Sequence, residues 1–272
     1  MNTIDLTFEQ LRANRRKAFI PFITAGDPDL DLTVQLIREL SARGAGLIEI
    51  GFPYSDPIAD GPVIQASYTR ALQKRLKLFS IFDAVRQLTQ SPRHPLTLSP
   101  LIAMVSYAIV FRHGLEAFVC DAKRAGFAGA IVPDLPVEEA GQLAAIAARE
   151  DFKLILLVTP TTPRERSVQI ARTSTGFVYF VSVVGITGER ATIPPGVLDQ
   201  IAWLRQQTEL PVCIGFGISR PEHVRMFAPV ADGVIVGSAI VRRIAEHGHL
   251  PASELVREVG EFVAPLIESL HG

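Results

Sequence analysis

Short apolar runs alternate with amphipathic, helix-like segments along almost the whole of this chain. Eight of the runs have the length and continuous apolar character of strands that are buried on both faces of a parallel sheet. These predicted strands are Ala18–Thr24, Leu47–Gly51, Leu98–Met104, Ala130–Val132, Leu154–Thr159, Val178–Val183, Val212–Gly215 and Val234–Val236. Polar or Gly/Pro-rich loops follow them, so the pattern predicts a repeated strand–helix unit.

The segments between the strands carry the helical period. They are Leu30–Arg43, Leu115–Ala125, Val137–Arg149, Pro163–Arg172, Gly196–Gln206, Pro221–Phe227 and the short Ala239–Ile244. A helix over Phe8–Asn14 is predicted before the first strand, and one over Glu254–Leu270, with Ser253 as its N-cap, after the last. Eight such units in about 250 residues are typical of a (β/α)8 barrel. We therefore predict an α/β protein, a (β/α)8 TIM barrel with an extra N-terminal helix, forming a single domain over residues 1–272. The alternative, an open doubly wound sheet, needs a G-x-G-x-x-G turn after an early strand, which the sequence lacks.

Composition and charge narrow the class of protein. With 27 Lys and Arg against 28 Asp and Glu, the net charge of −1 provides no field for a polyanion, so a nucleic-acid partner is not expected. Cys120 and Cys213 lie in apolar surroundings typical of reduced core cysteines. The first ten residues lack a signal-peptide pattern, and the longest apolar stretch, Pro100–Phe111, is too short to cross a membrane. We expect a cytoplasmic protein.

Glu49 is an unusual residue for its position inside the second predicted strand. Strand alternation places Leu47, Glu49 and Gly51 on one face, toward the barrel interior, and the intervening isoleucines on the other. Burial disfavours an ionised carboxylate, so Glu49 is expected to hold a proton near neutral pH, as a general acid must. The alternative is a structural glutamate paired with a buried cation.

The loop after this strand brings a second carboxylate. Phe52–Pro62 contains three prolines, which make it stiff, and it includes Asp56 and Asp60. Asp60 precedes Gly61-Pro62, a helix-start signal, so an N-cap role is an alternative for it, as a turn role is for Asp56. A stiff loop that returns Asp60 toward Glu49 would make a pair of acid–base groups.

Glycine-bearing segments follow the last three predicted strands, at Val184–Gly188, Gly215–Ser219 and Gly237–Ile240. Glycines let backbone N–H groups approach an anion closely, and the amino end of a helix adds a favourable dipole. Any one of these segments would be an ordinary turn. Because all three segments fall in the corner where such barrels bind phosphate, they predict a phosphate site. The nearby Arg220 is incidental to this prediction, because backbone amides alone can hold a phosphate.

Several motifs together resemble the tryptophan synthase α-subunit family. They are Pro21–Pro28, Glu49–Pro53, Ser55–Gln65, Pro133–Pro136, Gly185–Gly188, Gly215–Ser219 and Gly237–Val241, and the Ser55–Gln65 block is the most specific. The resemblance implies retro-aldol cleavage of indole-3-glycerol phosphate to indole and glyceraldehyde 3-phosphate. It implies that Glu49 protonates indole C3 and assists proton movement from the glycerol hydroxyl, and that Asp60 takes or stabilises the indole N1 proton.

The resemblance also implies the other site residues. The substrate-binding residues would be Phe22, Met104, Ile131, Tyr179 and Thr187, the phosphate-binding residues Gly188, Phe216, Gly217, Gly237 and Ser238, and the partner-interface residues Pro53 and Asp56. Ordinary barrel core is an equal alternative for Met104. The family uses no metal or cofactor in this chain. Its partner is a pyridoxal-phosphate-dependent β subunit in an α2β2 heterotetramer.

Two segments depart from the family pattern. Ser106–Val110 lacks the asparagine and proline usual after strand three, in a loop that contributes to the β-facing surface, and Gln73–Lys77 lacks a frequent glycine and is more typical of a solvated face. Two rival hypotheses stand beside the complexed α subunit. The first departure motivates one of them, a stand-alone lyase that releases free indole. The other is a catalytically silent barrel kept as a binding partner, against which the retained Glu49, Asp60 and glycine loops argue.

Overall fold

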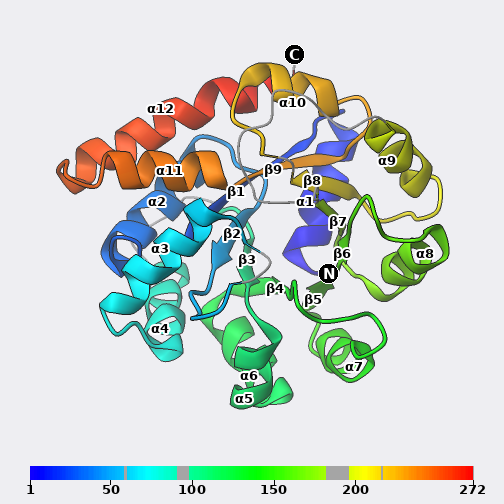
Figure 1. Ribbon diagram of the computed structural model, residues 1–272, viewed down its shortest axis with the longest axis horizontal. Helices are drawn as coiled ribbons and strands as arrows, with labels where there is room; N and C mark the ends of the chain where they lie inside the picture. Colours follow the sequence, from blue (N-terminus) through cyan, green and yellow to red (C-terminus); the bar gives the residue numbers. More distant parts are fainter. Residues whose placement is uncertain (58–59, 91–97, 182–195, 216, 272) are drawn as a thin grey trace.

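The strands form one parallel sheet that curls into a barrel, with α1 over its centre and the other helices around it (Figure 1). The computed structural model describes residues 1–57, 60–90, 98–181, 196–215 and 217–271. The strands in this part of the chain are β1 (Ala18–Thr24), β2 (Ile48–Gly51), β3 (Leu101–Met104), β4 (Phe127–Ile131), β5 (Lys153–Ile155), β6 (Leu157–Val158), β7 (Val178–Val181), β8 (Val212–Gly215) and β9 (Gly233–Val236).

The sheet order is β5-β4-β3-β2-β1-β9-β8-β7-β6, so its two edges are β5 and β6. Only Leu156 separates these two strands along the chain, and the circle of strands therefore closes on itself. The predicted (β/α)8 barrel is confirmed, but the single strand predicted over Leu154–Thr159 is wrong. β5 pairs with β4, whereas β6 pairs with β7. Between them the Leu156 amide donates to the Ser174 hydroxyl at 3.3 Å, which interrupts the ladder.

The helices follow most of the predicted segments. They are α1 (Thr3–Ala13), α2 (Leu30–Ala42), α3 (Pro62–Gln73), α4 (Leu78–Thr89), α5 (Tyr107–His113), α6 (Leu115–Ala125), α7 (Gly141–Arg149), α8 (Arg164–Thr173), α9 (Val197–Arg205), α10 (Pro221–Phe227), α11 (Ser238–Glu246) and α12 (Ala252–His271). The sequence did not predict α4 and α5. Ser253 is not an N-cap, because α12 starts one residue earlier and the Glu254 amide already bonds the Pro251 carbonyl. Two successive turns, from Pro136 to Glu139 and from Val137 to Ala140, delay the start of α7 to Gly141.

Two layers of apolar side chains follow from strand alternation. One layer fills the barrel and contains Leu47, Ile131 and Tyr179, with Ile4 and Phe8 of α1 beneath them. The other packs the strands against the helices and contains Ile48 and Ile50. The alternation predicted for β2 is therefore confirmed. In the described part of the chain, no helix is both long and apolar enough to cross a membrane.

Candidate active site

A cavity of about 500 Å³ lies at the carboxyl ends of the strands. Its wall includes Glu49 from β2, Met104 from β3, Tyr179 from β7 and Gly215 from β8, together with residues of the loops that follow them. In barrels of this type the carboxyl end of the sheet is where chemistry takes place, because the loops there vary without disturbing the core. The cavity is therefore the candidate active site.

Glu49 is the most deeply buried acid of this cavity. Its side chain is 0% exposed, and neither carboxyl oxygen has a hydrogen-bond partner among the described residues. Burial raises the pKa of Glu49 to about 8, and the negative charge of Asp60 adds to the effect. A carboxyl group in this state carries its proton at neutral pH and can donate it. No buried cation pairs with it in the described structure, so the structural alternative is not supported.

Asp60 stands at the cavity wall just before α3. The N-cap of α3 is Gly61, without a side-chain cap, and Pro62 is the first helical residue. The N-cap alternative for Asp60 is therefore wrong. Burial raises the pKa of Asp60 to about 6, a hydrogen bond from the Tyr54 hydroxyl lowers it, and the Asp134 charge raises it. Asp60 is thus mostly ionised at neutral pH, while Glu49 is mostly protonated.

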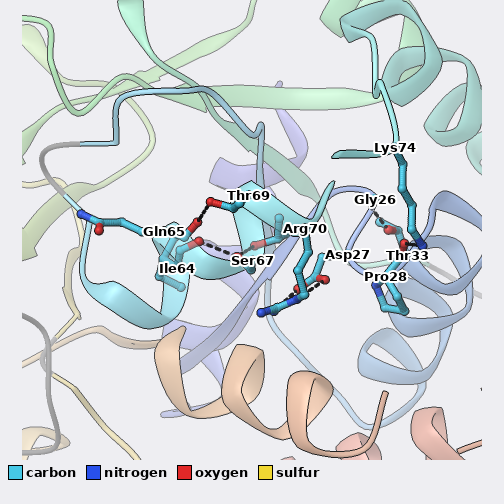
Figure 2. A network of polar contacts seen from close by, with 11 residues as sticks. Gly26, Asp27, Pro28, Thr33, Ile64, Gln65, Ser67, Thr69, Arg70 and Lys74 are labelled. Carbon is cyan, nitrogen blue, oxygen red and sulfur yellow. Dashed lines mark hydrogen bonds and ion pairs between the residues drawn. The ribbon is translucent and has the colours of Figure 1, made fainter. Parts of the chain in front are cut away.

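Helix α3 fixes the end of the loop that carries Asp60. The Gln65 side-chain amide donates to the Asp60 carbonyl at 2.8 Å and to the Pro57 carbonyl at 3.1 Å. One turn further on, Arg70 binds both carboxyl oxygens of Asp27, at 2.9 and 2.6 Å (Figure 2). Since Asp27 follows β1, the ion pair ties α3 to the barrel.

The apolar wall of the cavity includes three of the predicted substrate contacts, Phe22, Met104 and Tyr179. The fourth predicted contact that the structure describes, Ile131, is fully buried in the barrel interior and does not line the cavity.

Gly51 makes room for the aromatic side chains beside the cavity. A Cβ on Gly51 would lie 2.5 Å from the Phe22 ring and 2.9 Å from the Tyr68 hydroxyl.

The predicted phosphate corner follows β8 and β9, which are separated from β4 by several strands in either direction around the barrel. Gly217, Gly237 and Ser238 line the cavity there. Ser238 is the first residue of α11, and the Ile240 amide already bonds the Gly237 carbonyl, so the Ser238 and Ala239 amides are the ones available to an anion. Gly217 has φ +59°, a conformation that favours glycine. The predicted residues Thr187, Gly188 and Phe216 lie outside the described residues.

The two predicted interface residues lie beside the cavity rather than on its wall. Pro53 is buried and Asp56 is exposed. The sequence reasoning gave no role to several polar residues that the structure places at the site, among them Tyr54, Tyr68, Asp134 and Arg166. Tyr54 lies in the Phe52–Pro62 loop and Asp134 in the Pro133–Pro136 motif, but no pattern signalled Tyr68 or Arg166. Among the described residues, no group of three His, Cys, Asp or Glu side chains is arranged to hold a metal ion.

The arrangement suits acid–base chemistry on a substrate with an apolar ring and an anionic group. A protonated and an ionised carboxyl group share one cavity with aromatic side chains, and the start of α11 brings backbone amides to the same cavity. Two carboxyl groups whose environments separate their pKa values are typical of an acid and a base that act together.

Comparisons with known proteins give a consistent result. The sequence profile of the family described as "Tryptophan synthase alpha chain" matches residues 8–267. The tryptophan synthase alpha chain of Rhodopirellula baltica is 50% identical over 99% of both chains, and that of Synechocystis is 48% identical over 90% of this chain and 92% of its own. The crystal structure of tryptophan synthase subunit alpha from Legionella pneumophila has a TM-score of 0.89 and 35% identity, and covers 100% of this chain and 99% of its own.

Proposed function

The chain belongs to the tryptophan synthase alpha chain family, whose lyase reaction cleaves indole-3-glycerol phosphate, and we propose that Glu49 and Asp60 are its catalytic pair. The single observation that carries this proposal is that Glu49 and Asp60 line one cavity in different surroundings, Glu49 fully buried and Asp60 less enclosed. Burial accordingly raises the pKa of Glu49 to about 8 and that of Asp60 to about 6. At neutral pH one group holds a proton to donate, and the other is free to accept one.

Glu49 acts on the carbon–carbon bond. It gives its proton to indole C3, which turns the ring into a leaving group. Asp60, the base of the pair, accepts the hydrogen bond from N1–H and stabilises the positive charge that develops there. As the bond to the glycerol carbon breaks, its electron pair returns to the indole ring. The glycerol hydroxyl loses its proton to Glu49 and becomes the aldehyde of glyceraldehyde 3-phosphate. Glu49 ends with the proton that it had at the start, so no further reactant is consumed.

The rest of the site positions the substrate. Phe22, Met104 and Tyr179 form an apolar slot for the indole ring, with Ile131 supporting it from below. Gly217, Gly237 and Ser238 present amides, and in the last case a hydroxyl, to the phosphate. From the family resemblance, Thr187 is proposed to bind the substrate, and Gly188 and Phe216 to bind its phosphate. Fixing the two ends of the substrate sets C3 against Glu49.

The indole is passed on in a complex. We infer a partner, the pyridoxal-phosphate-dependent β subunit, in an α2β2 assembly, with Pro53 and Asp56 at the interface. Support comes from family membership and from the loop that carries Pro53, Asp56 and Asp60, because a partner bound there would act directly on the site. The cofactor would belong to the partner chain. We also propose that the enzyme works in the cytoplasm, as its membership of a biosynthetic family suggests.

A lyase assay on indole-3-glycerol phosphate tests these roles. Glu49→Gln keeps the shape of the side chain and removes its titrating proton, so kcat should fall by about 10²-fold or more. Asp60→Asn should also lower kcat, although less, because it stabilises charge rather than delivering the proton. Near-normal turnover of Glu49→Gln would reject the assignment of the acid.

The same assay with and without a β subunit tests the partner. We expect co-purification and a large rise in lyase rate on addition of the β subunit. A high rate of indole release by the isolated chain, unaffected by the β subunit, would favour the stand-alone lyase instead. Activity below detection in every combination would favour the silent binding partner.

A further inference from the structure

Two segments that the proposed reaction leaves without a role meet beside the cavity. They are Pro133–Pro136, which follows β4, and Ser106–Val110, which follows β3. Asp134 joins them, because its Oδ2 accepts a hydrogen bond of 2.7 Å from the Ser106 hydroxyl and its Oδ1 accepts one of 2.7 Å from the Tyr107 amide. The side chain is thus held by both oxygens in a single position.

Asp134 also lines the cavity that contains Asp60. Among the described residues of the cavity wall, the acids are Glu49, Asp60 and Asp134. The Ser106 and Tyr107 contacts therefore hold a negative charge at a fixed place on the cavity wall to which Asp60 also belongs.

We propose that Asp134 is a positioning residue of the reaction, whose anchored negative charge sets the strength of Asp60 as a base. A negative charge facing Asp60 makes its ionisation less favourable and so increases its affinity for a proton. This inference rests on the proposed role of Asp60. It gives the Ser106 hydroxyl a role too, because that hydroxyl supplies one of the two hydrogen bonds that hold Asp134.

The electrostatics agree with the geometry. The Asp134 charge raises the pKa of both Asp60 and Tyr54, although burial is the larger cause at each. The other groups that face Asp60 do not offer an equivalent charge. Glu49 of β2 is itself protonated near neutral pH, and Tyr54, Tyr68 of α3 and Tyr179 of β7 have pKa values raised by burial and stay neutral.

The one basic residue on the described cavity wall, Arg166 of α8, is paired with Glu138 at 2.6 Å and so contributes little net charge. Asp134 itself is exposed. Water therefore screens its charge, and its effect on Asp60 should be modest and should weaken as salt is added.

The experiment compares pH profiles of kcat/KM for the enzyme assayed with its β subunit. Asp134→Asn keeps both contacts, since the amide oxygen accepts from the Tyr107 amide and the amide nitrogen donates to the Ser106 hydroxyl, but it removes the charge. We expect the acidic limb of the profile to move to lower pH by about 0.3 unit, a two-fold loss of proton affinity. At high salt the wild type and this variant should converge.

Two further variants decide what causes the shift. Asp134→Ala removes the charge and both contacts and should move the acidic limb at least as far. Glu139→Gln removes the same charge from an exposed residue nearby that does not line the cavity, and should leave the limb in place. An unchanged limb in Asp134→Asn would overturn the proposal, even if Asp134→Ala were impaired, because the effect would then come from lost anchoring.

One control separates this proposal from the function on which it rests. Asp60→Asn should abolish the acidic limb. If the limb persists in Asp60→Asn, the assigned role of Asp60 is wrong. If it disappears there but does not move in Asp134→Asn, the role of Asp60 stands and that of Asp134 does not.

Discussion

At the scale of single residues, two carboxyl groups of the same cavity differ because their surroundings differ. Glu49 is inside a strand, fully buried and without a hydrogen-bond donor among the described residues. Asp60 is in a loop, less enclosed, and accepts a hydrogen bond from Tyr54. The charged form is therefore disfavoured more strongly at Glu49, and the backbone position of each residue decides which of the two is the acid.

The first prediction concerns the pH dependence of catalysis. The pKa values of both groups are raised, to about 6 for Asp60 and about 8 for Glu49. As pH rises through about 6, Asp60 loses its proton and becomes the base, so kcat/KM should increase. As pH rises further through about 8, Glu49 loses its proton and can no longer act as the acid, so kcat/KM should decrease. Steady-state assays from pH 5 to 9.5 measure this bell-shaped profile.

Because the two carboxyl groups interact electrostatically, the two apparent pKa values of the pH profile belong to the pair and not to either residue alone. Glu49→Gln provides the control, since any residual activity should lack the alkaline limb. A flat profile between pH 7 and 9.5 in the wild type would contradict a protonated Glu49.

Glu49 could be identified from the sequence, and Asp134 could not. Glu49 breaks the apolar pattern of a strand, and a local pattern is enough to show that an acid is buried there. Asp134 is held in place by hydrogen bonds from the Ser106 hydroxyl and the Tyr107 amide, which are 28 and 27 residues away along the chain. Such pairs depend on how two loops meet in space, which no single stretch of sequence records.

At the scale of elements, α3 connects the site to the barrel. Its first turn follows Asp60, Tyr68 packs against Tyr54 with ring centroids 5.5 Å apart, and the Ser67 hydroxyl lies 2.7 Å from that of Thr24. The sequence predicted that a helix starts after Asp60, because Gly61-Pro62 is a local helix-start signal. It did not predict the contacts further along the helix, since Thr24 and Asp27 are more than 40 residues away in the chain.

The second prediction tests this connection. Arg70→Gln leaves Asp27, which is only 3% exposed, without the cation that binds both its oxygens. We expect a loss of about 2 kcal/mol in the free energy of unfolding, less than for a fully buried pair because Arg70 is 38% exposed. We also expect kcat to fall several-fold, because α3 no longer holds Asp60 as firmly. Urea unfolding and lyase assays at 25 °C measure the two effects.

The matched control is Arg86→Gln in α4, which removes an exposed arginine paired with Asp83 on the same helix. It should change the free energy of unfolding by less than about 1 kcal/mol and leave kcat unaltered. Equal effects of the two substitutions would show that the Arg70–Asp27 pair has no special role.

At the scale of the whole molecule, the barrel separates stability from catalysis. The cavity occupies the carboxyl ends of the strands, and α1 crosses the other end, where it lies over the centre of the barrel (Figure 1). Asn2 fastens α1 by donating to the Ala128 carbonyl at 2.9 Å and to the Asp151 carbonyl at 2.7 Å. The extra N-terminal helix was predicted over Phe8–Asn14, but its position across the end of the barrel depends on contacts between residues 126 and 149 apart in the chain.

The third prediction uses this separation. Phe8 of α1 is 7% exposed and packs on Phe177 inside the barrel, with ring centroids 5.8 Å apart. Phe8→Ala should lower the free energy of unfolding by about 3 kcal/mol, the usual cost of emptying such a core position. Because α1 and the cavity are at opposite ends of the barrel, kcat and KM of the folded enzyme should not change. Leu6→Ala, on the same helix but at a residue 38% exposed, should have little effect on either property. If Phe8→Ala lowered kcat at a temperature where the enzyme is fully folded, then side-chain packing between α1 and the barrel would affect catalysis. The two ends of the barrel would in that case not be independent.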